Sequence, residues 1–303
     1  MSDAMESFPE GTPAGNDSPT AVTQPRQTSS GPKALSAGLT DRRGFAVPRP
    51  RRLPISAIEA TVAVLAFLGL WQLSGLFLAP IFVSTPSQVA QAFWRIAGGG
   101  LGSAFLASLE ELAVGFVIAC LLGVTVGLVM GRVRILDRAL DPYVAFANAA
   151  PLIAVLPLIV IWFGLGRSAR IVFVVAIGVW TMVVNTASGV KSVDRKYGDV
   201  GLAFGLSSGR ALRSIYLPAA MPFIFAGARI ALAQCVVGML IGGQEIGDAG
   251  LGGMVETEAG YGQTDALIAT VFCSTALALI CFWLLRTAQR VFFPWITGLA
   301  SSR

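Results

Sequence analysis

The sequence predicts an all-α membrane protein with six transmembrane helices, and three observations support this prediction. Of the 303 residues, 54% are hydrophobic and only 13% are charged, whereas soluble domains have about 25% charged residues. The mean hydropathy is +0.71. Six apolar runs each have about the 17–25 residues that a helix needs to cross the hydrocarbon core of a bilayer.

Residues 1–50 precede these runs and have a different composition. They are rich in Ser, Thr, Gly, Pro and Gln and poor in aromatic residues. Such a segment cannot bury enough apolar surface to offset the entropy lost on ordering. No apolar signal-peptide core appears before Arg52. We therefore expect a disordered tail at 1–50 and a transmembrane domain at 51–303.

The six apolar runs follow one another with short polar connections. They begin at Thr61, Leu112, Tyr143, Ile171, Ala219 and Ala266. The second run has glycines at spacings of four or eight, which predict close packing against another helix: Gly115, Gly123, Gly127 and Gly131. Prolines in the third run, Pro151 and Pro157, predict either a kink or a shaped pore wall.

The lysines and arginines are distributed unevenly between the connections, and this asymmetry predicts the orientation. One side collects the arginines from Arg42 to Arg52, those of 132–138, the basic residues of 191–213, and Arg286 and Arg290. The other side has only Arg95, Arg167 and Arg170. Both termini are therefore expected in the cytoplasm. The net charge of +5 comes from these short basic clusters beside apolar runs and not from a basic nucleic-acid-binding face. No nucleic-acid partner is therefore expected.

The cytoplasmic connection at about 190–217 is predicted to contain two helices. The first has an apolar face at helical spacing: Val193, Tyr197, Val200 and Phe204. Gly205 is suited to end this helix, since glycine tolerates a left-handed conformation.

Ser207 is then placed to cap a second helix, and Pro218 fits the first turn of the fifth span. The apolar face of the first helix has no lipid to enter if the connection projects into the cytoplasm. It is either a docking site for a soluble partner or a face packed on neighbouring loops or the membrane surface. Periodicity favours neither.

Several classes of active site have no support in the sequence. The chain contains no histidine, and its four cysteines lie inside apolar runs without a CxxC pair. Neither a metal site nor a cofactor is expected. No GxxxxGK[ST] motif is present, so any ATP that drives the protein must bind another chain. An ion-driven secondary transporter is the alternative, and it predicts repeats and paired intramembrane acids.

Polar residues inside the apolar runs are candidates for a translocation path. They are Asn148, Pro151, Asn185 and Arg229. For the amides, including Gln234, hydrogen bonds between helices are the structural alternative to contact with solute. For Arg229, the structural alternative is a carbonyl partner or an extended side chain that reaches the inner surface.

The connection also carries a family signature. Gly205, nine residues, Ile215, one residue, Leu217 and Pro218 reproduce the G-x9-I-x-LP core of the cytoplasmic motif in binding-protein-dependent ABC transporter permeases. Asp199, Val200 and Gly201 stand where the family usually has Glu-Ala-Ala. From about Ser84 to Asp265 the chain resembles the nitrate/taurine/alkanesulfonate branch, through STPSQV, SLEELAVGF, PLIAVLPLIVIWFGLG, NTASGVKSVD, GLG and QTD.

The resemblance implies the type I ABC importer fold, with a coupling helix between spans four and five. It implies a permease subunit for a small organic or inorganic anion such as a sulfonate, taurine or nitrate. The partners would be a pair of ATPase subunits, a second permease subunit (a homodimer), an extracytoplasmic solute-binding protein and membrane lipid. The implied coupling residues are Asp199, Val200, Phe204, Gly205, Ile215, Leu217 and Pro218. Glu111, Asn148 and Arg167 differ in charge from the branch pattern.

Overall fold

The computed structural model describes residues 57–75, 84–247 and 249–292. Every regular element among these residues is a helix. The tail expected at 1–50 lies outside the described residues. All of the described residues belong to one unit, Ile55–Arg303.

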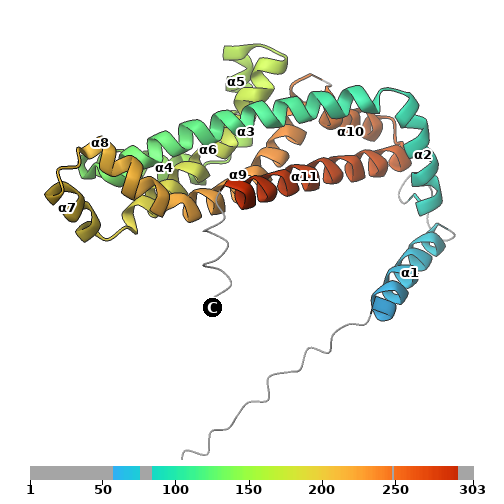
Figure 1. Ribbon diagram of the computed structural model, residues 1–303. Helices are drawn as coiled ribbons and strands as arrows, with labels where there is room; N and C mark the ends of the chain where they lie inside the picture. The colour runs from blue at the N-terminus through green and yellow to red at the C-terminus, as the bar shows by residue number, and fades with distance from the viewer. Residues whose placement is uncertain (1–56, 76–83, 248, 293–303) are drawn as a thin grey trace, which may run out of the picture. The chain divides into compact units, whose positions relative to one another are not determined.

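Four helical segments are long and apolar enough to cross a membrane. They are α3 (Leu101–Arg132), α6 (Arg167–Lys191), α9 (Leu217–Glu245) with the short elements before it, and α11 (Thr264–Phe292). They correspond to the second, fourth, fifth and sixth predicted spans. In Figure 1 they run side by side, and their buried faces enclose Leu112, Met182, Met239 and Leu277.

The predicted third span is not a single straight helix. It is divided into α4 (Arg134–Ala149), the 3₁₀ turn η1 (Leu152–Val155) and α5 (Leu156–Phe163), with a bend of 94° between the two parts. The reason is Pro151, because a proline disfavours helical backbone at the residue before it. Ala150 is accordingly extended, with φ −64° and ψ 140°.

The predicted first span also differs from the structure. The helix α1 (Ala57–Ser74) contains a shorter apolar stretch, Glu59–Leu73, and part of the predicted run falls outside the described residues. By length and composition, the described residues therefore provide four spans, or five if the bent pair counts as one, where six were predicted.

The contact between α3 and α6 explains the glycines of the second span. A Cβ atom on Gly123 would lie 2.2 Å from Cβ of Met182, and one on Gly127 would lie 2.6 Å from Cβ of Thr186. Gly115 and Gly131 meet α6 in the same way. The predicted packing role of these glycines is confirmed.

The opposite end from the 190–217 connection carries α2 (Pro86–Gly98) and α10 (Gly250–Gly260) (Figure 1). Thr85 is the N-cap residue of α2, before Pro86, and forms a capping box with Gln88. The connection between α9 and α11 contains the helix α10. Its Leu251 is fully buried, and the Leu251 N–H donates to Ser108 Oγ at 2.8 Å.

Candidate functional site

The connection between α6 and α9 contains the predicted helix, break and second helix. The first helix is α7 (Arg195–Ala203), and the second begins with α8 (Ser208–Ala211). Gly205 lies between them with φ +78°, a left-handed conformation that glycine adopts without steric cost. Ser207 occupies the predicted cap position, but its side chain makes no capping hydrogen bond.

The second helix continues into the fifth span. After α8 come the five-residue π-helical turn η2 (Leu212–Tyr216) and then α9, so that the helical run extends from Ser208 to Glu245. Pro218 lies in the first turn of α9, as predicted. Pro218 has no N–H to donate, so the regular helical hydrogen-bond pattern is interrupted there. The wider π-helical turn η2 lies directly before this interruption.

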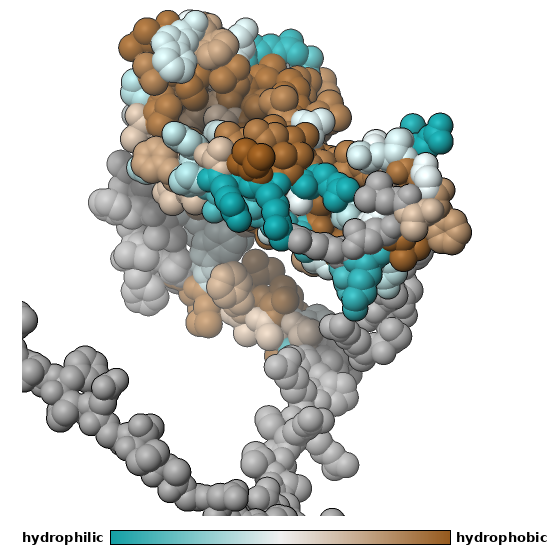
Figure 2. All heavy atoms as spheres, turned by 90° about the vertical axis from the view of Figure 1, so that its left-hand side faces the viewer, coloured by the Kyte–Doolittle hydropathy of each residue, from teal (hydrophilic) through white to brown (hydrophobic). Residues whose placement is uncertain are grey.

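The outer face of α7 is apolar and exposed. The side chains of Tyr197, of Val200 and of Phe204, the residue that follows the last turn of α7, are 64%, 54% and 84% exposed. Val193, predicted on the same face, instead packs against the cluster that contains Ala211 and Tyr216. The side chain of Asp199 lies outside the described residues. Figure 2 views the molecule from the end that carries α7 and α8, where apolar and polar side chains are interspersed.

The inner face of α7 lies close against η2. A Cβ atom on Gly198 would lie 2.2 Å from the hydroxyl oxygen of Tyr216, and one on Gly201 would lie 2.9 Å from Cδ1 of Ile215. Gly201 stands where the family motif usually has alanine. The contact explains this glycine, because the methyl group of an alanine would lie too close to Ile215. Ile215, which belongs to the G-x9-I-x-LP motif, thus positions α7.

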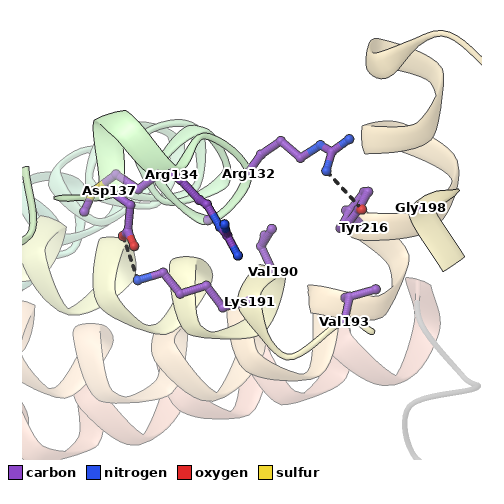
Figure 3. Close-up of a pocket in the computed structure, with 10 residues that line it drawn as sticks. Arg132, Arg134, Asp137, Val190, Lys191, Val193, Gly198 and Tyr216 are labelled. Atoms are coloured by element: carbon purple, nitrogen blue, oxygen red, sulfur yellow. Dashed lines mark hydrogen bonds and ion pairs between the residues drawn. The ribbon is translucent and has the colours of Figure 1, made fainter. Parts of the chain in front are cut away.

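Arg132 anchors the same contact from the end of α3. Its Nη1 donates to the Tyr216 hydroxyl at 3.1 Å, and its guanidinium lies 4.6 Å from the centre of the Tyr216 ring (Figure 3). Such cation–π contacts contribute about 0.5–1 kcal/mol at exposed sites. Charge counting gave Arg132 only a role in orientation, so its structural role was missed.

The candidate path amides meet around one threonine of α6. Thr181 Oγ1 donates to Gln234 Oε1 at 2.6 Å and lies 3.4 Å from Asn148 Oδ1. Asn185 Nδ2 donates to the Thr181 carbonyl at 2.8 Å. The contacts of Thr181 with Asn148 and Gln234 therefore join α4, α6 and α9, as the interhelical alternative expects for these two amides, whereas the Asn185 bond stays within α6.

The other two candidates lie in different surroundings. Arg229 Nη2 donates to Oε1 of Gln289, a buried side chain of α11. The partner that the structure gives Arg229 is therefore a side-chain amide of the neighbouring span. Pro151 is exposed at the bend between α4 and η1.

A buried ion pair was not anticipated from the sequence. Arg170 Nε donates to Glu111 Oε1 at 2.8 Å, and both residues are less than a tenth exposed. Arg170 Nη1 also donates to the Ile246 carbonyl at 2.9 Å, just beyond the end of α9. The acidic charge of Glu111, which departs from the branch pattern, is therefore neutralised within the subunit. The exposed neighbours Glu110 and Arg167 form a second pair.

Comparison with known proteins agrees with this architecture. Residues 121–298 match the family described as binding-protein-dependent transport system inner membrane component. The taurine transport system permease protein TauC of Escherichia coli K12 is 30% identical over 258 residues, which cover 82% of this chain and 92% of that protein. The riboflavin transport system permease protein RibX of Chloroflexus aurantiacus is 28% identical, covering 82% and 95%.

Two further comparisons concern the branch and the fold. The nitrate import permease protein NrtB of Synechococcus elongatus is 26% identical and covers 76% of this chain and 87% of that protein. A solved inward-facing structure of the MetNI methionine ABC transporter has a TM-score of 0.54 at 20% identity, covering 65% of this chain and 95% of that chain. The chain therefore belongs to the family of binding-protein-dependent transport system inner membrane components, as an ABC importer permease and not an enzyme.

Proposed function

We propose that this permease imports a small organic or inorganic anion, such as a sulfonate, taurine or nitrate, and couples to a separate ATPase through the 190–217 connection. The observation that carries the coupling proposal is the exposed apolar face of α7, formed by Tyr197, Val200 and Phe204. An exposed apolar patch of this kind is suited to docking. Family membership removes the support for an ion-driven secondary transporter.

The packing beneath α7 suggests how movement would be transmitted. Of the coupling residues, Asp199 and Val200 are on α7, Gly205 and Ile215 lie between α7 and α9, and Leu217 and Pro218 begin α9. Because Gly198 and Gly201 lie tightly against η2, a displacement of α7 would carry the start of α9 with it. Closure of a docked ATPase pair would then displace α9, provided that the two conformations differ in their contacts with the ATPase.

The path is proposed to pass the polar cluster of α4, α6 and α9. Asn148 and Asn185 meet there around Thr181, with Pro151 at the nearby bend and Arg229 nearer the start of α9. A second copy of the chain would supply the other half of the path. Both termini and the coupling loop would face the cytoplasm, and an extracytoplasmic binding protein would deliver the solute.

The coupling proposal is tested by Phe204→Asp. A charge at the most exposed apolar position of the docking face should abolish uptake and reduce co-purification with the ATPase, while the abundance of the permease in the membrane stays unchanged. Ser208→Asp is the matched control, because it adds the same charge at an exposed position in the first turn of α8. Normal uptake by a stably expressed Phe204→Asp variant would overturn the proposal.

The solute class needs a separate experiment. The cognate binding protein, purified from cells, should release an anionic ligand that mass spectrometry can identify. The names of the taurine and nitrate relatives support this expectation, whereas the riboflavin relative shows that the family also takes larger solutes. A ligand without a negative charge would contradict the proposed anion class and leave the coupling proposal intact.

A further inference from the structure

A pocket of about 480 Å³ lies where α3 and α6 end beside the coupling helix α7. Its walls include Arg132 of α3, Arg134 of α4, Lys191 of α6 and Gly198 of α7 (Figure 3). Tyr216, which fixes the position of α7, lines it as well. The pocket is on the side of α7 that faces the bundle, whereas Tyr197, Val200 and Phe204 face outward.

The charges that line the pocket do not cancel. Lys191 Nζ lies 2.6 Å from Asp137 Oδ1, so these two charges are paired. Arg132 has a neutral partner, the Tyr216 hydroxyl. Within the described part of the chain, Arg134 has no acidic partner. Two positive charges therefore remain on the walls of one pocket.

Helix dipoles account for two of the three basic residues. Arg132 and Lys191 lie in the last turns of α3 and α6, where a positive charge offsets the negative end of the helix. Arg134 is different, because it is the first residue of α4. The positive charge of Arg134 reinforces the partial positive charge of the helix N-terminus. The N-cap residue Val133 makes no side-chain hydrogen bond to the free N–H groups there. This combination favours an anion.

We propose that this pocket binds the phosphate group of an anionic ligand, supplied by a phospholipid headgroup. The pocket lies at the ends of α3 and α6, which are long and apolar enough to cross a membrane, and basic pockets between spans on the cytoplasmic side bind such headgroups. That the site is cytoplasmic, and that it acts on coupling, rests on the proposed function. A bound phosphate beside Arg132 and Gly198 would then hold α7 against Tyr216.

The test compares Arg134→Gln with Arg138→Gln in the full-length permease purified with its ATPase. Both arginines are exposed on α4 one turn apart, but only Arg134 lines the pocket. Binding of short-chain phosphatidylglycerol and of inorganic phosphate is measured for each variant. Arg134→Gln should weaken phosphatidylglycerol binding about tenfold, because it removes a charge-assisted hydrogen bond to the phosphate. Arg138→Gln should leave it unchanged.

The outcomes separate this inference from the coupling proposal. If only inorganic phosphate binds with the Arg134 dependence, the lipid source is overturned. Equal binding of both probes by the two variants would overturn the site itself. Because binding is measured without uptake, normal uptake by Phe204→Asp would remove the coupling proposal and leave the phosphate site standing.

Discussion

Glu111 and Arg170 are separated by 59 residues along the chain and form a buried ion pair between α3 and α6. A carboxylate inside a spanning helix is costly unless it is paired and hydrogen-bonded. Arg170 supplies the charge, and its bond to the Ile246 carbonyl ties the pair to the end of α9. The pair thus fixes three helices at one point.

We expect Glu111→Gln to destabilise the permease by about 3 kcal/mol, because breaking a buried pair leaves an uncompensated charge. The measurement is equilibrium unfolding in mixed micelles with SDS. Glu110→Gln is the matched control. It removes the adjacent carboxylate, whose pair with Arg167 is about half exposed, and such pairs contribute about 0–1 kcal/mol. Equal effects of the two substitutions would contradict the role of burial.

Glu258 of α10 is a second buried carboxylate, and it lies outside the spanning helices. Burial raises the pKa of its carboxyl group. The bond that Thr270 Oγ1 donates at 2.9 Å lowers the pKa, and the charge of Asp265 raises it. Glu258 Oε2 is buried and has no hydrogen-bond partner in the described part of the chain. This environment favours the protonated form.

The free energy of unfolding should therefore fall as pH rises. The unfolded chain loses the Glu258 proton near its ordinary pKa of 4.5, while the folded state holds it to higher pH. The stabilising contribution is complete below that ordinary value and is lost as pH passes through the raised one. Glu258→Gln should flatten this dependence in thermal unfolding, whereas the exposed Glu256→Gln on the same helix should retain it. An unchanged slope in Glu258→Gln would contradict the assignment.

At the scale of elements, the contact of α3 with α6 depends on the absence of side chains on α3. Gly123→Ala should destabilise the protein by about 2 kcal/mol, as overpacking of a close contact does. The new methyl group would meet Cβ of Met182. Gly102→Ala is the control, because nothing lies within 4 Å of the position of its Cβ and alanine favours the helix. Equilibrium unfolding in mixed micelles with SDS measures both variants. An unchanged free energy of unfolding in Gly123→Ala would show that α6 can shift to accommodate the methyl group.

The connection between α6 and α9 shows which features local sequence patterns predict and which depend on contacts between elements. Helical periodicity predicted α7 and, except for Val193, the residues of its apolar face, and Gly205 predicted its end. The exposure of that face is known only from the structure. The role of Tyr216 could not be read in this way, because its partners Arg132 and Gly198 come from other elements. Such contacts depend on which helix ends lie next to each other in the folded protein. The spacing of residues within one helix does not predict this.

At the scale of the whole molecule, charge asymmetry predicts that α7 faces the cytoplasm and α10 the outside. In a cysteine-free background, Ser208→Cys should react with a membrane-impermeant maleimide only in inside-out vesicles. Glu256→Cys should react only in intact cells or right-side-out vesicles. Both positions are exposed. Labelling of Ser208→Cys from the outside would reverse the proposed orientation.

The sequence by itself determined the membrane class, four of the spanning helices, the helix–break–helix of the coupling connection and the family. These depend on local properties: runs of apolar residues, helical spacing, and a glycine that permits a left-handed turn. The sequence also offered a kink at Pro151, and the structure set its size at 94°. The tertiary structure decided the Glu111–Arg170 pair, the amides around Thr181 and the basic pocket beside α7. Each of these brings together residues distant in sequence, or requires knowing how far a helix continues once its neighbours are in place. Packing between helices sets such features, and a linear pattern does not contain it.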